Sequence, residues 1–165
     1  MTTAERAEVD VPVVRISRQS LALASRHAIE AGSKELGGIL VGWWEDSGTA
    51  VVHDLLIVPD AGAGWNHYKR KHRGAQKVLN DYRDGLDDHR VGYIGEWHSH
   101  PAPQQPSGTD RAALTLIARR SGSPVVLVVL SAERGEVTPY ALIGRPGRWP
   151  RRRTIEGATI ERMDP

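Results

Sequence analysis

The sequence predicts an α/β protein that folds as a single domain. Short apolar runs with strand character alternate along the chain with segments in which apolar residues recur at helical spacing. The 165 residues are 39% hydrophobic, which is enough to bury one sizeable core. The expected order of elements is β-α-β-β-α-β-α-β-β, contained in residues 13–144.

The N-terminal part of the chain is expected to give one strand and one helix. The first residues are polar and lack periodicity, so we expect a disordered lead-in over residues 1–12. The apolar run Val11–Ile16 then has strand character. Ser20 can cap a helix near residues 20–32, because its hydroxyl can accept hydrogen bonds from the first helical N–H groups. Gly32 stands where a glycine is expected to end that helix.

A hairpin and a second helix are predicted next. Two β-rich runs, Gly38–Trp44 and Thr49–Val58, flank a polar loop at residues 45–48 that ends in glycine, which is typical of an antiparallel hairpin. Residues Pro59–Trp65 are rich in glycine and alanine and indicate a loop. Apolar and charged residues then alternate at helical spacing over Arg73–Asp84, which predicts the second helix.

The second half of the chain is predicted to hold three strands and one helix. Val91–Ser99 is a strand, Asp110–Arg120 a helix, Pro124–Leu130 a buried strand and Val137–Ile143 the last strand. Glycine, proline and arginine dominate from residue 145 onward. Residues 145–165 are therefore expected to form a basic, extended tail.

Composition excludes several kinds of chemistry. The chain has no cysteine, which excludes disulfides, thiolate metal ligands and a cysteine nucleophile, so any metal must be held by histidine and carboxylate. Its longest strongly apolar run is far shorter than the roughly 20 residues of a membrane-spanning helix, and no secretory signal is visible. We therefore expect a soluble, cytoplasmic protein without membrane contact. A net charge of +2 is too small to imply nucleic acid.

The most informative stretch is His-Ser-His-Pro at the end of a predicted strand. Alternate residues of a strand share a face, so His98 and His100 point the same way and can share one ion. Pro101 cannot extend the strand, which leaves both rings at an open end. For an isolated pair, two histidines bonded to backbone carbonyls would be the better interpretation. The residues that follow change that balance.

Ser107 and Asp110 open the next predicted helix. On their own they indicate a helix cap with a carboxylate in the first turn. Asp110, however, shares the apolar face of the helix, so its carboxylate should point inward and need a partner. A divalent cation held by both histidines would supply that partner and keep a coordination position open for water. Zinc is the favoured metal, although ligand type alone does not exclude iron or manganese.

Hydrolysis at such a site also needs a base, and two carboxylates qualify. Glu35 stands just before the second strand, and Glu96 lies two residues before His98 on the same face. The physics of the sequence does not choose between them. A solvated carboxylate at the end of a helix is the simpler interpretation of Glu35.

A basic run precedes the second helix. Trp65, His67 and Tyr68 lead into a cationic series that could bind nucleic acid or a peptide tail; its candidate contact residues are Lys69, Arg70, Lys71 and Arg73. Cations at a helix N-terminus oppose the helix dipole, so helix stability does not explain them. The simpler alternative is a solvated loop and helix start.

Taken together, the ordered pieces resemble the JAMM family of zinc isopeptidases (MPN-plus or JAB domains), above all its prokaryotic branch. These pieces are a glutamate before a glycine-containing strand, then His-x-His-Pro, then Ser-x-x-Asp. The likeness covers about Val13–Gly144 and implies a JAMM/MPN-type, cytidine-deaminase-like fold, with a mixed, curved β-sheet flanked by helices. The spacing from His100 to Asp110 is slightly shorter than is common in the family, and the shortening falls in the loop 101–106.

The resemblance also implies roles for individual residues. It implies one zinc ion per chain, bound by His98, His100 and Asp110. It places the acid/base on Glu35 and support of the oxyanion on Ser107. Glu96 then becomes a neighbour that orients a ligand or tunes the site.

The function implied is that of a JAMM-type zinc metalloprotease, a deubiquitinase-like isopeptidase. Its expected substrate is a ubiquitin-like protein or its conjugates, cut at the ubiquitin-like C-terminus for maturation or deconjugation. Activating and conjugating enzymes encoded nearby are expected partners. Three alternatives stay open: processing of a sulfur-carrier protein by the same chemistry, a non-catalytic MPN-type scaffold, and nucleic-acid binding through residues 69–73.

Overall fold

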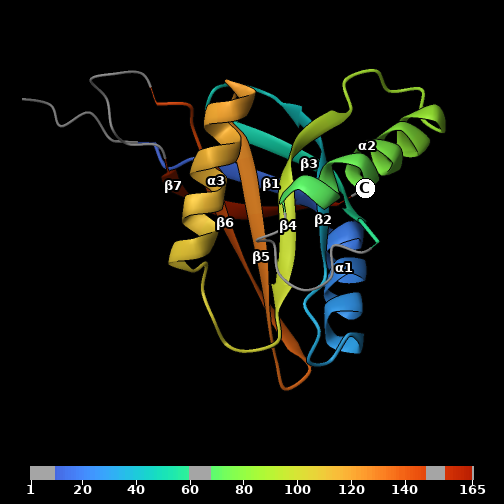
Figure 1. Ribbon diagram of the computed structural model, residues 1–165, viewed down its shortest axis with the longest axis vertical. Coiled ribbons are helices and arrows are strands. Elements are labelled where there is room, and N and C mark those ends of the chain that lie inside the picture. The colour runs from blue at the N-terminus through green and yellow to red at the C-terminus, as the bar shows by residue number, and fades with distance from the viewer. Residues whose placement is uncertain (1–9, 60–67, 148–154, 165) are drawn as a thin grey trace, which may run out of the picture.

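The computed structural model describes residues 10–59, 68–147 and 155–164, and only the backbone of residues 68–72. These residues form seven strands and three helices. Figure 1 shows how they are arranged. The elements are β1 (Val13–Ser17), α1 (Arg18–Glu30), β2 (Gly37–Trp44), β3 (Thr49–Ile57), α2 (Tyr68–Asp84), β4 (Gly92–His100), α3 (Gly108–Ser121), β5 (Val125–Glu133), β6 (Glu136–Gly144) and β7 (Ile155–Met163).

The strands form one mixed sheet that closes on itself in the order β1-β3-β2-β4-β5-β6-β7. β1 is parallel to β3 and to β7, and β4 is parallel to β5, whereas the other neighbours are antiparallel. The α/β class is confirmed, and β2 and β3 form the predicted antiparallel hairpin. The parallel pairing of β4 and β5 is made possible by α3, which carries the chain back between them.

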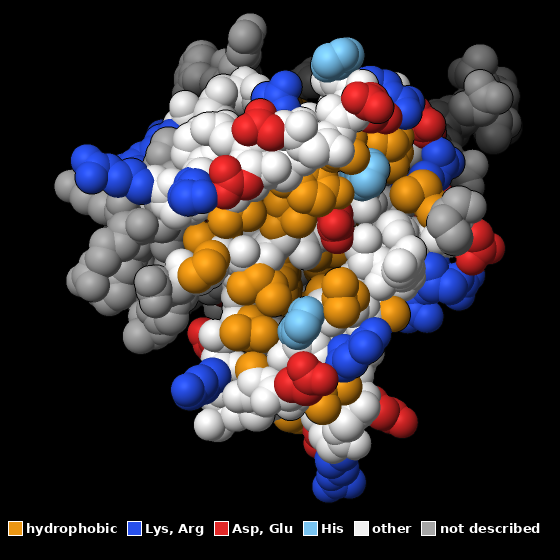
Figure 2. All heavy atoms as spheres, turned by 90° about the vertical axis from the view of Figure 1, so that its right-hand side faces the viewer, with side chains coloured by type: hydrophobic (Ala, Val, Ile, Leu, Met, Phe, Trp, Pro, Cys, Tyr) orange, Lys and Arg blue, Asp and Glu red, His pale blue; other side chains and the backbone are white. Residues whose placement is uncertain are grey.

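The three helices lie against different parts of the sheet (Figure 1), and each packs against an apolar cluster. α1 packs Leu21 and Ala24 against the largest cluster, which also contains Trp97. α3 packs Leu114 against a second cluster with β5 and β6, and α2 covers a third cluster that includes Val41. On the face that carries α1 and α2, hydrophobic side chains gather in the middle and most charged ones lie around them (Figure 2). None of the described helices is long and apolar enough to cross a membrane.

All three helices begin earlier than predicted, α3 at Gly108 instead of Asp110. α1 is capped by Ser17 rather than Ser20, since the backbone N–H of Ser20 donates to the Ser17 hydroxyl. α2 begins at Tyr68 instead of Arg73, because its apolar stripe starts late and the cationic first turns hide the helix from a pattern search. The predicted stop at Gly32 is confirmed by its left-handed backbone, with φ of 62°.

The prediction of an extended tail over residues 145–165 is wrong for its second half. Ile155–Met163 form β7, which pairs with β1 and β6 and closes the sheet. No residue of β7 is fully buried, so the strand lacks the apolar run by which strands are found in a sequence. Of the lead-in expected over residues 1–12 and the loop expected over residues 59–65, residues 1–9 and 60–65 lie outside the described residues.

Strands β2 and β3 approach each other closely at Gly38, and replacing this glycine tests that approach. A Cβ atom there would lie 1.7 Å from the carbonyl oxygen of Leu56, while a Cβ at Gly92 on β4 would meet no atom within 4 Å. We expect Gly38→Ala to lower the free energy of unfolding by about 3 kcal/mol or more, since backbone must move. Gly92→Ala should stay within about 0.5 kcal/mol of the native protein. Urea unfolding of both variants checks this, and equal losses would contradict the close approach.

Candidate metal centre

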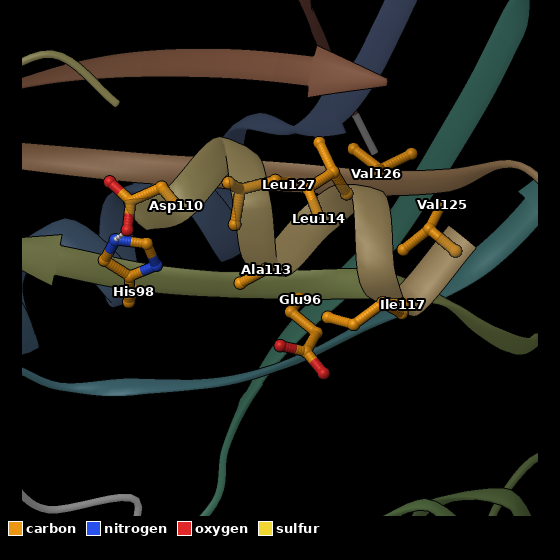
Figure 3. A pocket seen from close by; sticks show the side chains of 9 residues that line it. All are labelled: Glu96, His98, Asp110, Ala113, Leu114, Ile117, Val125, Val126 and Leu127. Atoms are coloured by element: carbon orange, nitrogen blue, oxygen red, sulfur yellow. Dashed lines mark ion pairs between the residues drawn. The ribbon is translucent and has the colours of Figure 1, made fainter. Parts of the chain in front are cut away.

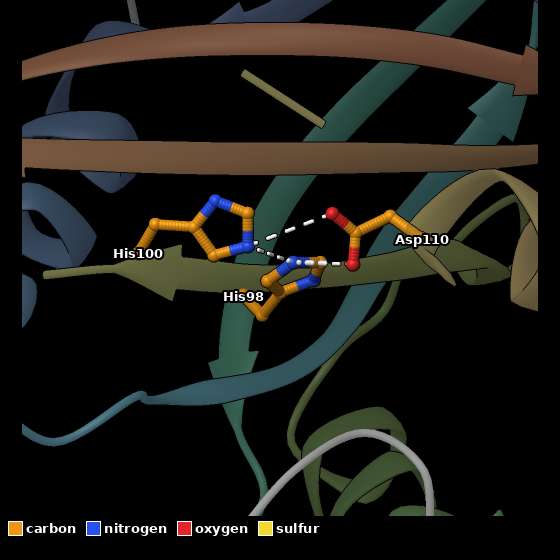
Figure 4. Close-up of side chains that lie close together, drawn as sticks. All are labelled: His98, His100 and Asp110. Carbon is orange, nitrogen blue, oxygen red and sulfur yellow. Dashed lines mark hydrogen bonds and ion pairs between the residues drawn. The ribbon is translucent and has the colours of Figure 1, made fainter. Parts of the chain in front are cut away.

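Three side chains converge where β4 ends and α3 begins (Figure 4). His98 and His100 are alternate residues of β4, and Asp110 lies in the first turn of α3. The Nε2 atoms of the two histidines are 3.1 Å apart. Asp110 Oδ1 lies 3.1 Å from Nε2 of His98, and Oδ2 lies 3.5 Å from Nε2 of His100. The face shared by the histidines and the inward direction of the aspartate are as predicted.

The three groups are buried, although all are polar. His98 is 3% exposed, His100 6% and Asp110 9%. Their candidate ligand atoms lie within 4.8 Å of one another. Two imidazole nitrogens and one carboxylate oxygen are a donor set that zinc and other borderline divalent cations accept, and a cation would compensate the buried negative charge. The arrangement is therefore compatible with a metal site.

Asp110 is held in its charged form. Burial by itself would raise the pKa of its carboxyl, but hydrogen bonds from His98 and from the backbone N–H of Ser107 outweigh burial and leave the pKa below its usual range. A carboxylate that stays ionised is ready to bind a cation without first losing a proton.

The start of α3 serves the helix and the site at the same time. The hydroxyl of Ser107 accepts the backbone N–H of Asp110 at 3.1 Å, and Oδ2 of Asp110 accepts the backbone N–H of Ser107 at 2.6 Å. This is the predicted capping box. A side-chain hydrogen bond from Ser107 also helps to keep the pKa of Asp110 low, and Oδ1 of Asp110 faces His98.

The loop between β4 and α3 orients the second histidine. Nδ1 of His100 lies 3.2 Å from the backbone carbonyl oxygen of Gln104. Only a protonated Nδ1 can bond to a carbonyl oxygen, and in a neutral ring this leaves the lone pair on Nε2, the atom that faces Asp110. The short loop 101–106 thus brings its carbonyl to His100 and its far end to the aspartate.

Glu35 is exposed and lies in the residues that lead into β2. Its neighbour Leu36 is tied to β4 twice, since the Leu36 N–H donates to the hydroxyl of Ser99 at 3.0 Å and the Ser99 N–H donates to the Leu36 carbonyl at 2.8 Å. One further step of this antiparallel register brings Glu35 level with His100. This register would place Glu35 near the end of β4 that holds His98, His100 and Asp110, here called the metal-type cluster.

Glu96 lies on the same strand face as His98 and lines a pocket beside it (Figure 3). The pocket runs between α3 and the strands β4 and β5, and its other walls are mostly apolar. The hydroxyl of Tyr93 donates to Glu96 at 3.5 Å. Glu96 is thus next to the cluster and outside it.

The basic run is described in part. Residues 69–71 lie in the first turns of α2, and nothing is described of their side chains, while Arg73 is exposed. Trp65 and His67 lie outside the described residues.

Sequence reasoning missed Ser131, a buried serine whose hydroxyl forms hydrogen bonds to the loop 101–106. Its one signal is that it is the first polar residue after the apolar run of β5.

Comparison with known proteins gives consistent matches. The family described as prokaryotic homologs of the JAB domain matches residues 17–143. A CD-NTase/cGAS isopeptidase from Enterobacter hormaechei subsp. hoffmannii is 32% identical over 143 residues, which cover 82% of this chain and 77% of that protein. The probable metalloprotease y4qB from Sinorhizobium fredii is 30% identical over 123 residues, which cover 67% of this chain and 71% of that protein.

A solved structure shares the fold. The solution structure of protein DSY2949 from Desulfitobacterium hafniense superposes with a TM-score of 0.67 at 17% identity, covering 92% of this chain and 94% of that one. At this level of identity the likeness concerns the arrangement of strands and helices.

Proposed function

Because the chain belongs to the family of prokaryotic homologs of the JAB domain, we propose that it is a zinc-dependent isopeptidase that cuts at the C-terminus of a ubiquitin-like protein. Family membership confirms the resemblance carried by the sequence motif. The names of the two relatives, an isopeptidase and a probable metalloprotease, support a hydrolase. That the metal is zinc and that the substrate is a ubiquitin-like protein are our proposals.

The observation that carries the proposal is the convergence of His98, His100 and Asp110 at the end of β4. These residues would hold the ion, with two nitrogens and one oxygen as in catalytic zinc sites that keep one position open. When bound, zinc would supply a Lewis acid for the scissile carbonyl and an activated water. A scaffold protein would have no need to bury three converging ligands.

The remaining chemistry falls to groups on the rim of the cluster. Glu35 would accept a proton from the attacking water and return it to the leaving amine, since one further step of the β2–β4 register would bring it level with His100 and its side chain is exposed. The hydroxyl of Ser107, which lies beside Asp110 at the start of α3, would donate its proton to the oxyanion. Glu96, beside the cluster in the pocket, would contact the substrate.

The substrate is proposed from chemistry and from one relative. An isopeptidase cuts the bond between a carboxyl terminus and a lysine side chain, and the relative from Enterobacter is named for action on a CD-NTase or cGAS-type protein. We propose a conjugate of that kind, with a ubiquitin-like protein as the acyl part. Release of an amino acid from a sulfur-carrier protein would use the same chemistry. A comparison of candidate substrates would reveal it.

The test is cleavage of defined substrates by protein purified without a histidine tag. Candidate ubiquitin-like proteins joined to a lysine side chain would be compared with linear fusions, with and without a zinc chelator. We expect cleavage of the isopeptide substrate, loss of cleavage with chelator and recovery on adding zinc back. Cleavage that survives complete removal of metal would contradict the proposal.

A further inference from the structure

A buried serine on β5, Ser131, lies next to the metal-type cluster without being one of its three members. Ser131 is 4% exposed and pairs in register with His100 on the neighbouring strand β4. The residues of β5 before it, Val125–Leu130, are apolar and buried. A hydroxyl at the end of such a run costs free energy unless it is hydrogen-bonded, so its partners indicate what it does.

Both hydrogen bonds of the Ser131 hydroxyl go to the backbone of the loop 101–106. Its hydroxyl donates to the carbonyl oxygen of Ala102 at 2.7 Å and accepts the N–H of Gln104 at 3.0 Å. The N–H of Gln104 also donates to the Ala102 carbonyl at 2.8 Å, which closes a tight turn over the serine. The hydroxyl therefore fixes the peptide units on both sides of the turn.

The same residue, Gln104, is the one that meets the metal-type cluster. Its carbonyl oxygen lies 3.2 Å from Nδ1 of His100, so N–H and C=O of one residue link Ser131 to His100. The side chain of Gln104 is exposed, and only its backbone takes part. The path from β5 to the imidazole thus consists of two hydrogen bonds and the backbone of one residue, Gln104.

We propose that Ser131 is a positioning residue that holds the ring of His100 in the orientation and tautomer required of a metal ligand, acting through the backbone of Gln104. This inference rests on the proposed function, in which His100 binds the ion. The parallel register of β4 and β5 supports it, because the serine stands opposite the histidine it orients. Groups that hydrogen-bond to a metal-binding histidine raise its basicity and fix its direction.

The test compares Ser131→Ala, Ser131→Thr and Ser121→Ala. Ser121 is the matched control, since its hydroxyl also accepts a loop N–H and donates to carbonyls, but at the far end of α3. Zinc affinity would be measured by competition with a chromogenic chelator. We expect Ser131→Ala to weaken zinc binding by about tenfold or more, whereas Ser131→Thr restores it and Ser121→Ala leaves it unchanged.

A second measurement does not need the metal. Nitrogen NMR of the metal-free protein reports which ring nitrogen of His100 carries the proton, and we expect Nδ1 in the native protein and a mixture of tautomers in Ser131→Ala. Unchanged zinc affinity together with an unchanged His100 tautomer in Ser131→Ala would overturn the proposal. If native protein binds zinc but cleaves no substrate, the proposed function fails and the affinity series still decides the role of Ser131. If native protein binds no zinc, the tautomer decides it.

Discussion

Replacing Glu35 with glutamine should leave zinc bound and lower kcat for isopeptide hydrolysis by about 10²- to 10⁴-fold, the contribution typical of a general acid–base group. The amide keeps the size of the carboxylate but cannot accept the proton of the attacking water. Glu35 is exposed and is not a member of the buried cluster of His98, His100 and Asp110, so the change should not disturb metal binding or folding. Steady-state kinetics with zinc content measured on the same sample checks both expectations.

Glu96→Gln is the matched control for Glu35→Gln. Glu96 is the other carboxylate near the cluster, and it lies on the same strand face as His98. If it contacts substrate, its loss should raise KM more than it lowers kcat. The opposite result, with kcat lost in Glu96→Gln and kept in Glu35→Gln, would move the base to β4 and overturn the present assignment.

The cluster could be predicted from the sequence because its geometry depends on local rules. Alternation along a strand places His98 and His100 on one face, and helical spacing turns Asp110 toward the core. The pocket-facing position of Glu96 follows from the same alternation. Which carboxylate serves as base does not follow, since the position of Glu35 relative to the cluster depends on the pairing of β2 with β4, which are far apart in sequence.

The parts that the sequence could not reveal depend on long-range pairing. Ser131 meets His100 only because β5 pairs parallel with β4 in one register, and no local pattern fixes that register. β7 has no apolar run, but it pairs with β1 and β6, and its partly buried Ile155, Ala158 and Ile160 pack against two core clusters. Exposed ion pairs such as Arg15 with Glu161 add little. A tail rich in charge and lacking buried residues reads as solvated until its partner strands are known.

Asp110→Asn should abolish tight zinc binding while the fold persists. Loss of an outer partner of a metal ligand typically costs 10- to 100-fold in affinity, so loss of a charged ligand should cost more than about 100-fold. The asparagine side-chain oxygen can still accept the N–H of Ser107, which keeps the helix cap that Asp110 provides. The variant therefore separates the metal role of Asp110 from its structural role, which Asp110→Ala would not.

The measurement is metal content after dialysis, together with the melting temperature with and without zinc. A ligand that binds only the folded state stabilises it by about 2.7 kcal/mol at a free concentration 100 times its Kd, so native protein should melt higher with zinc. Asp110→Asn should melt close to metal-free native protein and gain nothing from zinc. His98→Ala, which leaves the capping box untouched, should behave in the same way. A variant that kept stoichiometric zinc would show that the ion lies elsewhere, and the catalytic proposal would then lose the site on which it depends.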